Sequence, residues 1–412
     1  MLDIKYIRDN KEELKRKVAE KQFDPSLVDR VFELDKKRKE VLSEVEGLRA
    51  ERNKIAKEKT QDARKLGKKI KESLKKIEPE LKELESGFTK AVLQIPNPAA
   101  GDVKVGKNES ENEILRTWGE PVENAKFKDH LTLGEELGII DIERAAKVSG
   151  TRFAYLKGDA ALLEFALVNF AFDILTSEGF NPIVPPTLIT RESMEGMGYL
   201  EHNGEDDMYV LDKDGLILAG TSEQSIGPMH KGEIIQKEDL PLRYAGFSSC
   251  FRREAGSYGK DTRGIIRVHQ FDKVEMFSFT LPEKSEEEHE YLLSLEEKLF
   301  QSLKIPYRIV KMCTGDLGAP YCKKFDLEAW MPGQGNFREV TSTSSSTDFQ
   351  ARRLNIRYQD KGNVGYVHML NGTAFAIGRT LVAIMENYQN EEGSITIPEV
   401  LKKYMGKDVI TK

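Results

Sequence analysis

The first hundred residues carry two long, mostly hydrophobic series spaced alternately four and three positions apart. The first series lies within residues 27–55 and the second within residues 66–95. Spacing of this kind, sustained over many turns, is typical of helices that pack along a coiled-coil seam. The pattern predicts an antiparallel helical coiled-coil hairpin over residues 27–95, about 45 Å long at about 1.5 Å per residue. The predicted seam consists of Leu27, Val31, Leu34, Arg38, Val41, Val45, Leu48, Arg52 and Ile55, then Leu66, Ile70, Leu74, Ile77, Leu81, Leu84, Phe88, Ala91 and Ile95.

Prolines and polar residues mark where these helices begin, turn and end. Asp24-Pro25 precedes the first helix, and Pro96-Asn97-Pro98 follows the second. The polar segment Thr60-Gln61-Asp62 is predicted to join the two helices. Pro79 stands inside the second helix, where we expect a kink or a local break because proline lacks the backbone donor.

Basic residues gather in the distal half of this predicted hairpin. The whole chain has a net charge of -6, yet residues 49–76 hold 12 Lys/Arg and 4 Asp/Glu, so this segment is +8 and the remainder is -14. A solvated coiled-coil surface is one interpretation. Contact with RNA phosphates is the better one, because a solubilising surface would mix both signs. The segment has no aromatic residue, so we expect contact with the backbone of a folded RNA rather than base stacking. The candidate RNA-contacting residues are Arg49, Arg52, Lys54, Lys57, Lys59, Arg64, Lys65, Lys68 and Lys69.

Composition narrows the class of protein further. The 412 residues are 39% hydrophobic and give room for two or three domains. No run approaches 18 apolar residues and the N-terminus lacks the features of a secretory signal, which predicts a cytoplasmic protein without a membrane span. The three cysteines lie in strand-like segments without CxxC pairing and are predicted to be buried thiols. Six histidines without metal-ligand spacing argue against a structural zinc.

The rest of the chain mixes helices and strands without a doubly wound βαβ rhythm. Neither GxGxxG nor GxxxxGK[ST] follows a strand, so a nucleotide site must be built in another way. The sequence predicts an α+β protein with residues 1–98 as a helical arm, 99–115 as a linker and 116–412 as the main domain. Residues 161–175 are predicted to form an amphipathic helix.

A strand–loop–strand segment supplies the strongest chemical signal. If residues 267–279 form a strand, the odd positions share one face, and Arg267, Phe271 and Glu275 lie roughly 13 Å apart in turn. That step is about the distance from an adenine ring to a group joined through its α-phosphate. Arg252 and Glu254 are predicted to share a face of the preceding strand, and residues 256–264 to form a hairpin loop.

Two later segments complete a predicted site for a nucleoside triphosphate. Gly378-Arg379 opens a helix with an apolar stripe, so that helix dipole and guanidinium act together on a γ-phosphate. A capping or surface ion pair is the alternative for Arg379. Residues 339–342 are predicted to end a strand, with Glu339 and Ser342 holding Mg²⁺ through oxygen ligands. An ordinary strand terminus is the alternative there.

This ordered set resembles the signature motifs of class II aminoacyl-tRNA synthetases, and the segment from Gly179 to Pro186 resembles the motif at their dimer interface. The coiled-coil arm narrows the resemblance to the seryl-tRNA synthetase family, over nearly the whole chain. The segments that carry it are Thr221-Ser222-Glu223, Phe251-Arg252-Arg253-Glu254-Ala255-Gly256, Thr314-Gly315-Asp316-Leu317-Gly318 and Thr347-Asp348-Phe349-Gln350-Ala351-Arg352-Arg353.

The resemblance implies a class II antiparallel sheet flanked by helices, a homodimer, and ATP-dependent charging of tRNA(Ser) with L-serine, without DNA as a partner. It implies serine contacts from Thr221, Ser222, Glu223, Glu275 and Thr373. Arg252 and Arg379 are the implied catalytic residues. The implied ATP-binding set is Arg252, Arg253, Glu254, Arg267, Val268, Phe271, Glu339, Val340, Thr341, Ser342 and Arg379.

Two positions depart from the family pattern. Many members carry serine where Thr373 stands, and residues 343–346 differ from the usual segment. Neither departure removes a group that the chemistry requires, so we expect an active enzyme. The alternatives are an inactive RNA-binding paralogue, and a class II enzyme for threonine, proline or glycine. The latter is disfavoured because only residues 380–412 follow Arg379, too few for an anticodon-binding domain.

Overall fold

A computed structural model describes residues 1–58, 60–122, 127–202, 204–255 and 263–412. The predicted RNA contact Lys59 and most of the predicted loop over residues 256–264 lie outside the described residues. The chain divides into two compact units, Met1–Pro98 and Ala99–Lys412, and each is described by itself.

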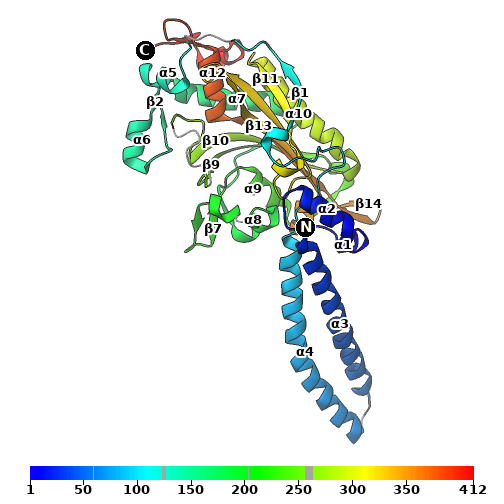
Figure 1. Ribbon diagram of the computed structural model, residues 1–412. Helices are drawn as coiled ribbons and strands as arrows, with labels where there is room; N and C mark the ends of the chain where they lie inside the picture. Colours follow the sequence, from blue (N-terminus) through cyan, green and yellow to red (C-terminus); the bar gives the residue numbers. More distant parts are fainter. Residues whose placement is uncertain (59, 123–126, 203, 256–262) are drawn as a thin grey trace. The chain divides into compact units, whose positions relative to one another are not determined.

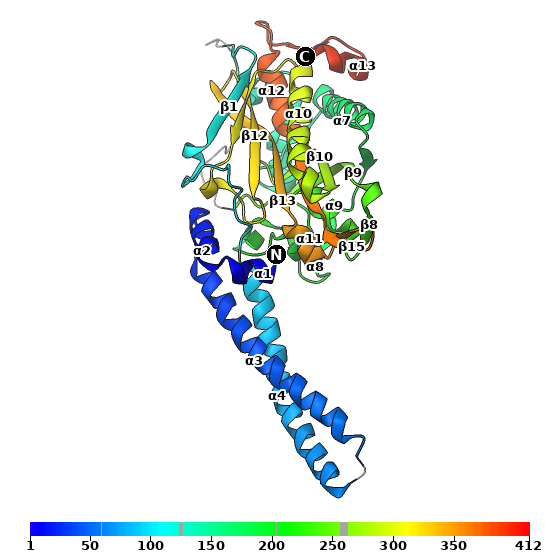
Figure 2. The same ribbon diagram turned by 90° about the vertical axis from the view of Figure 1, so that its right-hand side faces the viewer.

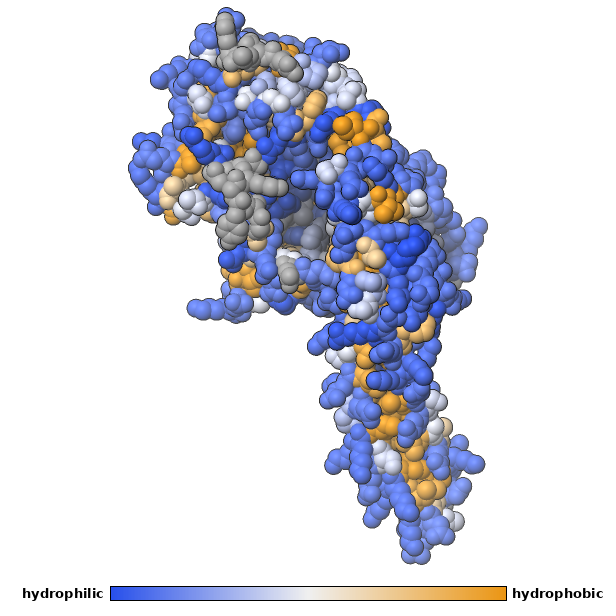
Figure 3. Space-filling view, viewed as in Figure 1, coloured by the Kyte–Doolittle hydropathy of each residue, from blue (hydrophilic) through white to orange (hydrophobic). Residues whose placement is uncertain are grey.

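The first unit is a helical hairpin. Its helices are α1 (Ile4–Asp9), α2 (Lys11–Glu20), α3 (Ser26–Ile55) and α4 (Gln61–Leu93). The last two lie side by side and antiparallel, which confirms the predicted hairpin (Figures 1 and 2). Val45 and Ile55 of α3 pack with Ile70, Leu74 and Leu81 of α4. Figure 3 shows the apolar side chains as an orange stripe between the charged surfaces of the two helices. The helices are thus held together by a narrow seam, as the 4-3 spacing requires.

Polar residues modify this seam at defined points. Asp35 is buried near the base of the hairpin, where Arg8 Nε donates to it at 2.7 Å and Arg38 Nη2 at 3.0 Å. Burial opposes its ionisation, but these hydrogen bonds prevail and lower the pKa of Asp35 to about 2. Arg52, predicted to lie in the seam, is exposed. Helix α4 continues through Pro79, so the predicted local break is absent.

The second unit is built on an eight-stranded sheet in the order β1-β11-β12-β13-β16-β10-β9-β4. All neighbours are antiparallel except the edge pair of β4 and β9, which confirms the predicted α+β class. The strands are β1 (Glu113–Trp118), β4 (Asn181–Ile183), β9 (Leu242–Phe251), β10 (Gln270–Thr280), β11 (Tyr307–Lys311), β12 (Lys323–Met331), β13 (Asn336–Thr347) and β16 (His368–Ala376).

Three long helices pack on this sheet, and Figure 2 shows them grouped over it. They are α7 (Asp159–Ser177), α10 (Ser285–Ser302) and α12 (Ile377–Asn387), and their apolar faces belong to the largest hydrophobic cluster of the domain. Helix α7 is long and apolar enough to pass a length-and-composition test for a membrane span, but half of its most apolar window is buried inside the domain. Helix α12 follows β16 without a loop, which fixes the position of its first turn.

Shorter elements surround this framework. The remaining α-helices of the described residues are α5 (His130–Glu136), α6 (Ile142–Ser149), α8 (Arg191–Met197), α9 (Glu223–Ile226), α11 (Phe349–Leu354) and α13 (Lys402–Met405). Two three-stranded sheets are formed by β15 (Asn363–Tyr366), β14 (Arg357–Asp360) and β8 (Ile234–Gln236), and by β5 (Leu188–Thr190), β7 (Leu216–Leu218) and β6 (Val210–Leu211). Two-stranded sheets pair β2 (Ile140–Asp141) with β3 (Tyr155–Leu156) and β17 (Ile395–Thr396) with β18 (Val409–Ile410).

Three predicted strand boundaries are wrong. Strand β9 ends at Phe251, so Arg252 and Glu254 lie beyond it, and Glu254 has a left-handed φ of 53° instead of an extended backbone. Strand β10 begins at Gln270, which leaves Arg267 in the preceding loop. Residues 339–342 lie in the middle of β13 rather than at its end. After the end of β9, the backbone N–H of Arg253 donates to the backbone oxygen of Asp207, a contact between distant segments that periodicity alone does not reveal.

The cysteines follow the prediction in part. All three are buried and free, as expected. Only Cys250 lies in a strand, on β9. Cys313 follows the end of β11 and Cys322 precedes β12, so their placement within strands was wrong.

Candidate functional site

A cavity of about 400 Å³ opens on the sheet where β9, β10, β13 and β16 meet the first turn of α12. Most of the predicted site residues line it. They are Thr221, Glu223, Arg252, Glu254, Arg267, Val268, Phe271, Glu275, Glu339, Val340, Thr341, Ser342, Thr373 and Arg379. Two are not brought to it: Ser222 Oγ donates to the backbone oxygen of Gly246 on β9 at 3.4 Å, and Arg253 lies over the ring of Tyr209.

Two arginines, Arg252 and Arg379, line one end of the cavity. Arg252 Nε donates to the backbone oxygen of Gly220 at 3.1 Å, and its guanidinium lies 5.3 Å from the centre of the Phe271 ring. Arg379, on the first turn of α12, donates from Nη1 to Glu339 Oε2 at 2.9 Å. This end therefore offers two permanent positive charges beside a flat aromatic ring, which suits a phosphorylated purine.

The loop before β10 adds an ion pair to this end. Arg267 Nη1 donates to Glu254 Oε2 at 2.6 Å. Although neither residue lies on a strand as predicted, both reach the cavity, because the left-handed turn at Glu254 brings its carboxylate back toward Arg267.

A β-bulge places Glu339 and Ser342 on the same side of β13. Leu327 of β12 pairs with Thr341 while its neighbour Glu328 pairs with Glu339, which leaves Val340 as an extra residue. In a regular strand, positions three apart point to opposite faces; one extra residue returns both to one face. Thr341 points the other way, since its Oγ1 donates to Glu296 of α10 at 2.8 Å.

The bulge fits the donor set predicted for a divalent cation. Burial opposes ionisation of Glu339, but the charges of Arg379 and Lys324 prevail and lower its pKa to about 2, so it offers carboxylate oxygens at neutral pH. Ser342 adds a hydroxyl oxygen on the same side. In the described part of the chain no group of three or more His, Cys, Asp or Glu could hold a metal ion. A cation bound here would take its remaining ligands from phosphate oxygens.

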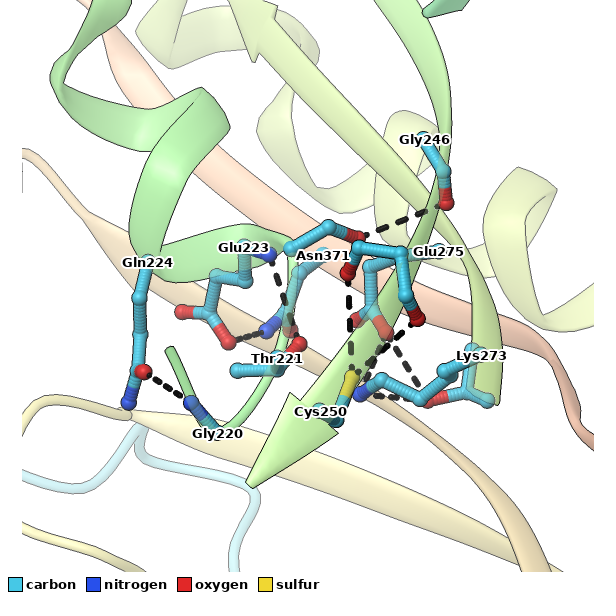
Figure 4. Close-up of polar contacts among 12 residues, drawn as sticks. Gly220, Thr221, Glu223, Gln224, Gly246, Cys250, Lys273, Glu275 and Asn371 are labelled. Atoms are coloured by element: carbon cyan, nitrogen blue, oxygen red, sulfur yellow. Dashed lines mark hydrogen bonds and ion pairs between the residues drawn. The ribbon is translucent and has the colours of Figure 1, made fainter. Parts of the chain in front are cut away.

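The opposite end of the cavity is built around the buried carboxylate of Glu223, at the start of α9. Tyr199 Oη donates to it at 2.9 Å, Tyr321 Oη at 3.0 Å and Gln350 Nε2 at 3.3 Å. Asn371 Nδ2, on β16, makes a fourth hydrogen bond (Figure 4). Burial and then the charge of Glu275 raise the pKa of Glu223, against the effect of these hydrogen bonds.

A second buried carboxylate lies beside the first, on β10. Lys273 Nζ lies 2.5 Å from Glu275 Oε2 (Figure 4). Thr373 Oγ1 of β16 donates to the same oxygen at 3.3 Å. Strand alternation confirms that Phe271, Lys273 and Glu275 share the cavity face. With both carboxylates ionised, these two groups and one lysine give this end a net charge of -1, which complements one ammonium group.

The predicted RNA contacts lie in the other unit. The described members of that set, at positions 49, 52, 54, 57, 64, 65, 68 and 69, are all exposed. Arg49 forms an ion pair with Glu78 of α4 at 2.8 Å.

Comparison with known proteins agrees with both units. A family described as the seryl-tRNA synthetase N-terminal domain matches residues 1–99, and the tRNA synthetase class II core domain (G, H, P, S and T) matches residues 209–388. The serine–tRNA ligase of Dictyoglomus thermophilum is 49% identical, over 98% of each chain. The chain belongs to the seryl-tRNA synthetase family.

Solved structures of seryl-tRNA synthetases agree over the full length. That of Pyrococcus horikoshii, complexed with ATP, has a TM-score of 0.95 and 42% identity, and covers 100% of this chain and 99% of that one. The cytoplasmic serine–tRNA ligase of Naegleria fowleri, in complex with AMP, has a TM-score of 0.90 and 37% identity, with the same coverage.

Sequence reasoning missed several residues of this synthetase's cavity. Lys273 could have been found, because it lies between Phe271 and Glu275 on the odd-numbered face. Asn371 could have been found in the same way, because it lies two residues before Thr373 on β16 and alternation puts both on one face. Tyr199 and Tyr321 come from loops far apart in the chain and carried none.

Glu296 of α10 supports the site from the opposite face of the sheet. It is fully buried and accepts from Thr341 Oγ1, next to the bulge of β13. The ladder between β13 and β16 reaches only to the pair of Thr343 and Gly372. A Cβ at Gly372 would lie 3.0 Å from Glu296 Oε1, so the glycine leaves room for this carboxyl. Glu296 thus fills the gap where the two strands part.

Burial raises the pKa of Glu296 well above its usual range, and the nearby charges of Glu275 and Asp326 act in the same direction. Such a carboxyl binds more protons folded than unfolded, so its contribution to stability is full below the unfolded-state pKa and is lost as pH rises through the folded one. We expect Glu296→Gln to match the wild type in melting temperature at pH 5 and to exceed it by about 2 °C or more at pH 8. Thermal unfolding at both pH values checks this, with exposed Glu290→Gln on the same helix as control. An equal difference at both pH values would contradict it.

Proposed function

We propose that this chain activates L-serine with ATP and transfers the seryl group to the 3′ end of tRNA(Ser). The observation that carries the proposal is one cavity with permanent positive charge at one end and a net -1 pocket containing a hydroxyl at the other. Full-length similarity to serine–tRNA ligases supports an active enzyme and not the inactive RNA-binding alternative. Arg252, Glu254 and Arg379, which such a paralogue could lose, are all present.

The arginine end takes ATP. Phe271 offers its ring to the purine, so that Arg252, now over that ring, moves toward the α-phosphate and stabilises the charge that develops there. Glu254 accepts from the adenine amino group, while Arg267 and Arg379 contact the β- and γ-phosphates of the folded-back triphosphate. The ATP and AMP complexes of the two solved relatives support a nucleotide in this cavity.

Glu339 and Ser342 would hold Mg²⁺ together with the nucleotide. When bound, the ion neutralises charge on the triphosphate and orients the pyrophosphate leaving group. The bulge at Val340 supports this role because it turns both oxygen donors to the cavity. Arg379 keeps the Glu339 carboxylate ionised and in place.

The carboxylate end takes serine. Glu223 faces the substrate ammonium, whereas Glu275 and Thr373 bind the hydroxyl, with Thr221 at the edge of the cavity. Alanine would leave these buried polar groups unpaired, so it should be rejected strongly. Threonine must be excluded by volume, and the methyl group of Thr373 narrows the pocket where many relatives carry serine.

The reaction then proceeds in two steps. The serine carboxylate oxygen attacks the α-phosphorus, which forms seryl-adenylate and releases pyrophosphate. A hydroxyl of the terminal tRNA ribose attacks the acyl carbonyl, which forms the ester and releases AMP. Both steps need positioning and charge stabilisation and no nucleophile from the protein.

The arm and a homodimer complete the proposal. The exposed basic residues of α3 and α4 contact tRNA phosphates. Dimer formation is supported by an apolar patch where α7 meets β4: Leu162 and Phe165 are 52% and 57% exposed, and Val184 just after β4 is 80% exposed. We place the enzyme in the cytoplasm, in keeping with its three free buried thiols.

Arg379→Ala should lower serine-dependent ATP–pyrophosphate exchange about 100- to 1000-fold, because it removes a permanent charge from the triphosphate site. Binding of tRNA should stay unchanged, since that depends on the arm. Arg308→Ala is the control, because Arg308 pairs with Glu328 at 2.5 Å on the same sheet but does not line the cavity. Retained exchange in Arg379→Ala would contradict the assignment.

Charge reversal at the arm tip should separate charging from activation. In the triple variant Arg64→Glu, Lys65→Glu and Lys68→Glu we expect kcat/KM for tRNA charging to fall about 10- to 100-fold and the salt dependence of tRNA binding to weaken. Pyrophosphate exchange should stay at the wild-type rate. Reversal of the exposed Lys36, Lys37 and Lys82 serves as the matched control. Equal loss in both assays would refute this division of labour.

Phe165→Asp should convert the dimer to a monomer, because it places a charge in the apolar patch of α7. Light scattering after size-exclusion chromatography measures the mass. Val148→Asp, at an exposed apolar position of α6, should leave the dimer intact. A dimeric Phe165→Asp variant would exclude this face as the interface.

A further inference from the structure

The hydrogen-bond partners of Glu223 are all neutral in the described part of the chain. Its carboxylate accepts from the hydroxyls of Tyr199 and Tyr321 and from the side-chain amides of Gln350 and Asn371. These donors come from four separate places: the loop after α8, the loop before β12, α11 and β16. A fully buried carboxylate is therefore satisfied in hydrogen bonds while its charge is left uncompensated by contact.

The neighbouring carboxylate, that of Glu275, has a charged partner. Lys273 lies 2.5 Å from Glu275 Oε2, so that charge is already paired. The charged groups with the largest effect on the pKa of Glu223 are Glu275, which raises it, and Lys273, which lowers it, both on β10. In this pocket Glu223 is thus the carboxylate without a cation in direct contact among the described residues.

The two tyrosines form a linked pair at this carboxylate. Their hydroxyls lie 2.5 Å apart, and each also lies within hydrogen-bond distance of Glu223. Each hydroxyl has one proton, so one tyrosine donates to the carboxylate while the other donates either to the carboxylate or to its neighbour. Burial, followed by the charge of Glu223, raises the pKa of both phenols well above their usual range, so both remain protonated donors wherever the enzyme works. Lys or Arg in their place would cancel the carboxylate charge, and Phe would leave the desolvated carboxylate with only the amide donors of Gln350 and Asn371.

We propose that Tyr199 and Tyr321 are positioning residues that keep the Glu223 carboxylate ionised and aimed into the cavity, so that the ammonium of serine supplies the missing cation. The inference rests on the proposed function and deepens it. Neither tyrosine needs to touch the reacting atoms. Their role is to hold the ionised Glu223 carboxylate in the position where it contacts the ammonium group of serine.

The test is the pH profile of the serine KM in ATP–pyrophosphate exchange, for the wild type and for Tyr199→Phe, Tyr321→Phe and the double variant. Loss of the donors favours the protonated, neutral form of Glu223, so the variants should bind serine poorly at low pH and recover as pH rises. We expect the double variant's serine KM to exceed the wild-type value at least about tenfold at pH 6 and less than about threefold at pH 8.5. The KM for ATP should not change.

Tyr291→Phe is the matched control, because Tyr291 Oη donates to Glu178 Oε2 at 2.8 Å, the same kind of contact, outside the cavity. Adding Glu223→Gln to the double variant should abolish the pH dependence, since no titrating group then remains at that point. If the double variant does not fold, the single variants carry the test.

The possible outcomes separate the two proposals. A wild-type enzyme without serine-dependent exchange overturns the proposed function and this inference with it. An active wild type whose Tyr→Phe variants show a serine KM raised equally at every pH, or not raised at all, overturns the inference alone. A KM defect confined to low pH, absent from Tyr291→Phe, supports it.

Discussion

The structure depends on one electrostatic constraint: two buried carboxylates, Glu223 and Glu275, share a small pocket with a single lysine. Desolvated carboxylates at such close quarters would ordinarily take up a proton. Lys273 pairs with one of them, and neutral donors hold the other. With both carboxylates ionised, the pocket has one negative charge that is not paired with a cation, which matches the charge of one ammonium group.

The sheet around this pocket is irregular in the places that the site requires. An extra residue at Val340 turns Glu339 and Ser342 to the same side, and another at Ala374 lies next to Thr373 on β16. Where β13 and β16 part, Glu296 fills the space from behind. Bulges next to active sites commonly re-aim side chains in this way. The regular part of the sheet supplies rigidity, and its irregularities supply the geometry.

Much of this could be predicted from the sequence, because the signals were periodic. The 4-3 spacing predicted the hairpin of α3 and α4, and alternation placed Phe271 and Glu275 on one face of β10. Features set by tertiary contact could not be predicted. The left-handed turn at Glu254, the buried Asp35 and the tyrosines around Glu223 depend on segments far apart in the chain.

The most direct test of the central claim is amino-acid-dependent ATP–pyrophosphate exchange, measured with each of the twenty amino acids in turn. The charge and the hydroxyl-binding groups of the pocket predict exchange with serine, and exchange with alanine and threonine lower by about 100-fold or more. Exchange driven best by another amino acid, or no exchange with any, would contradict the account.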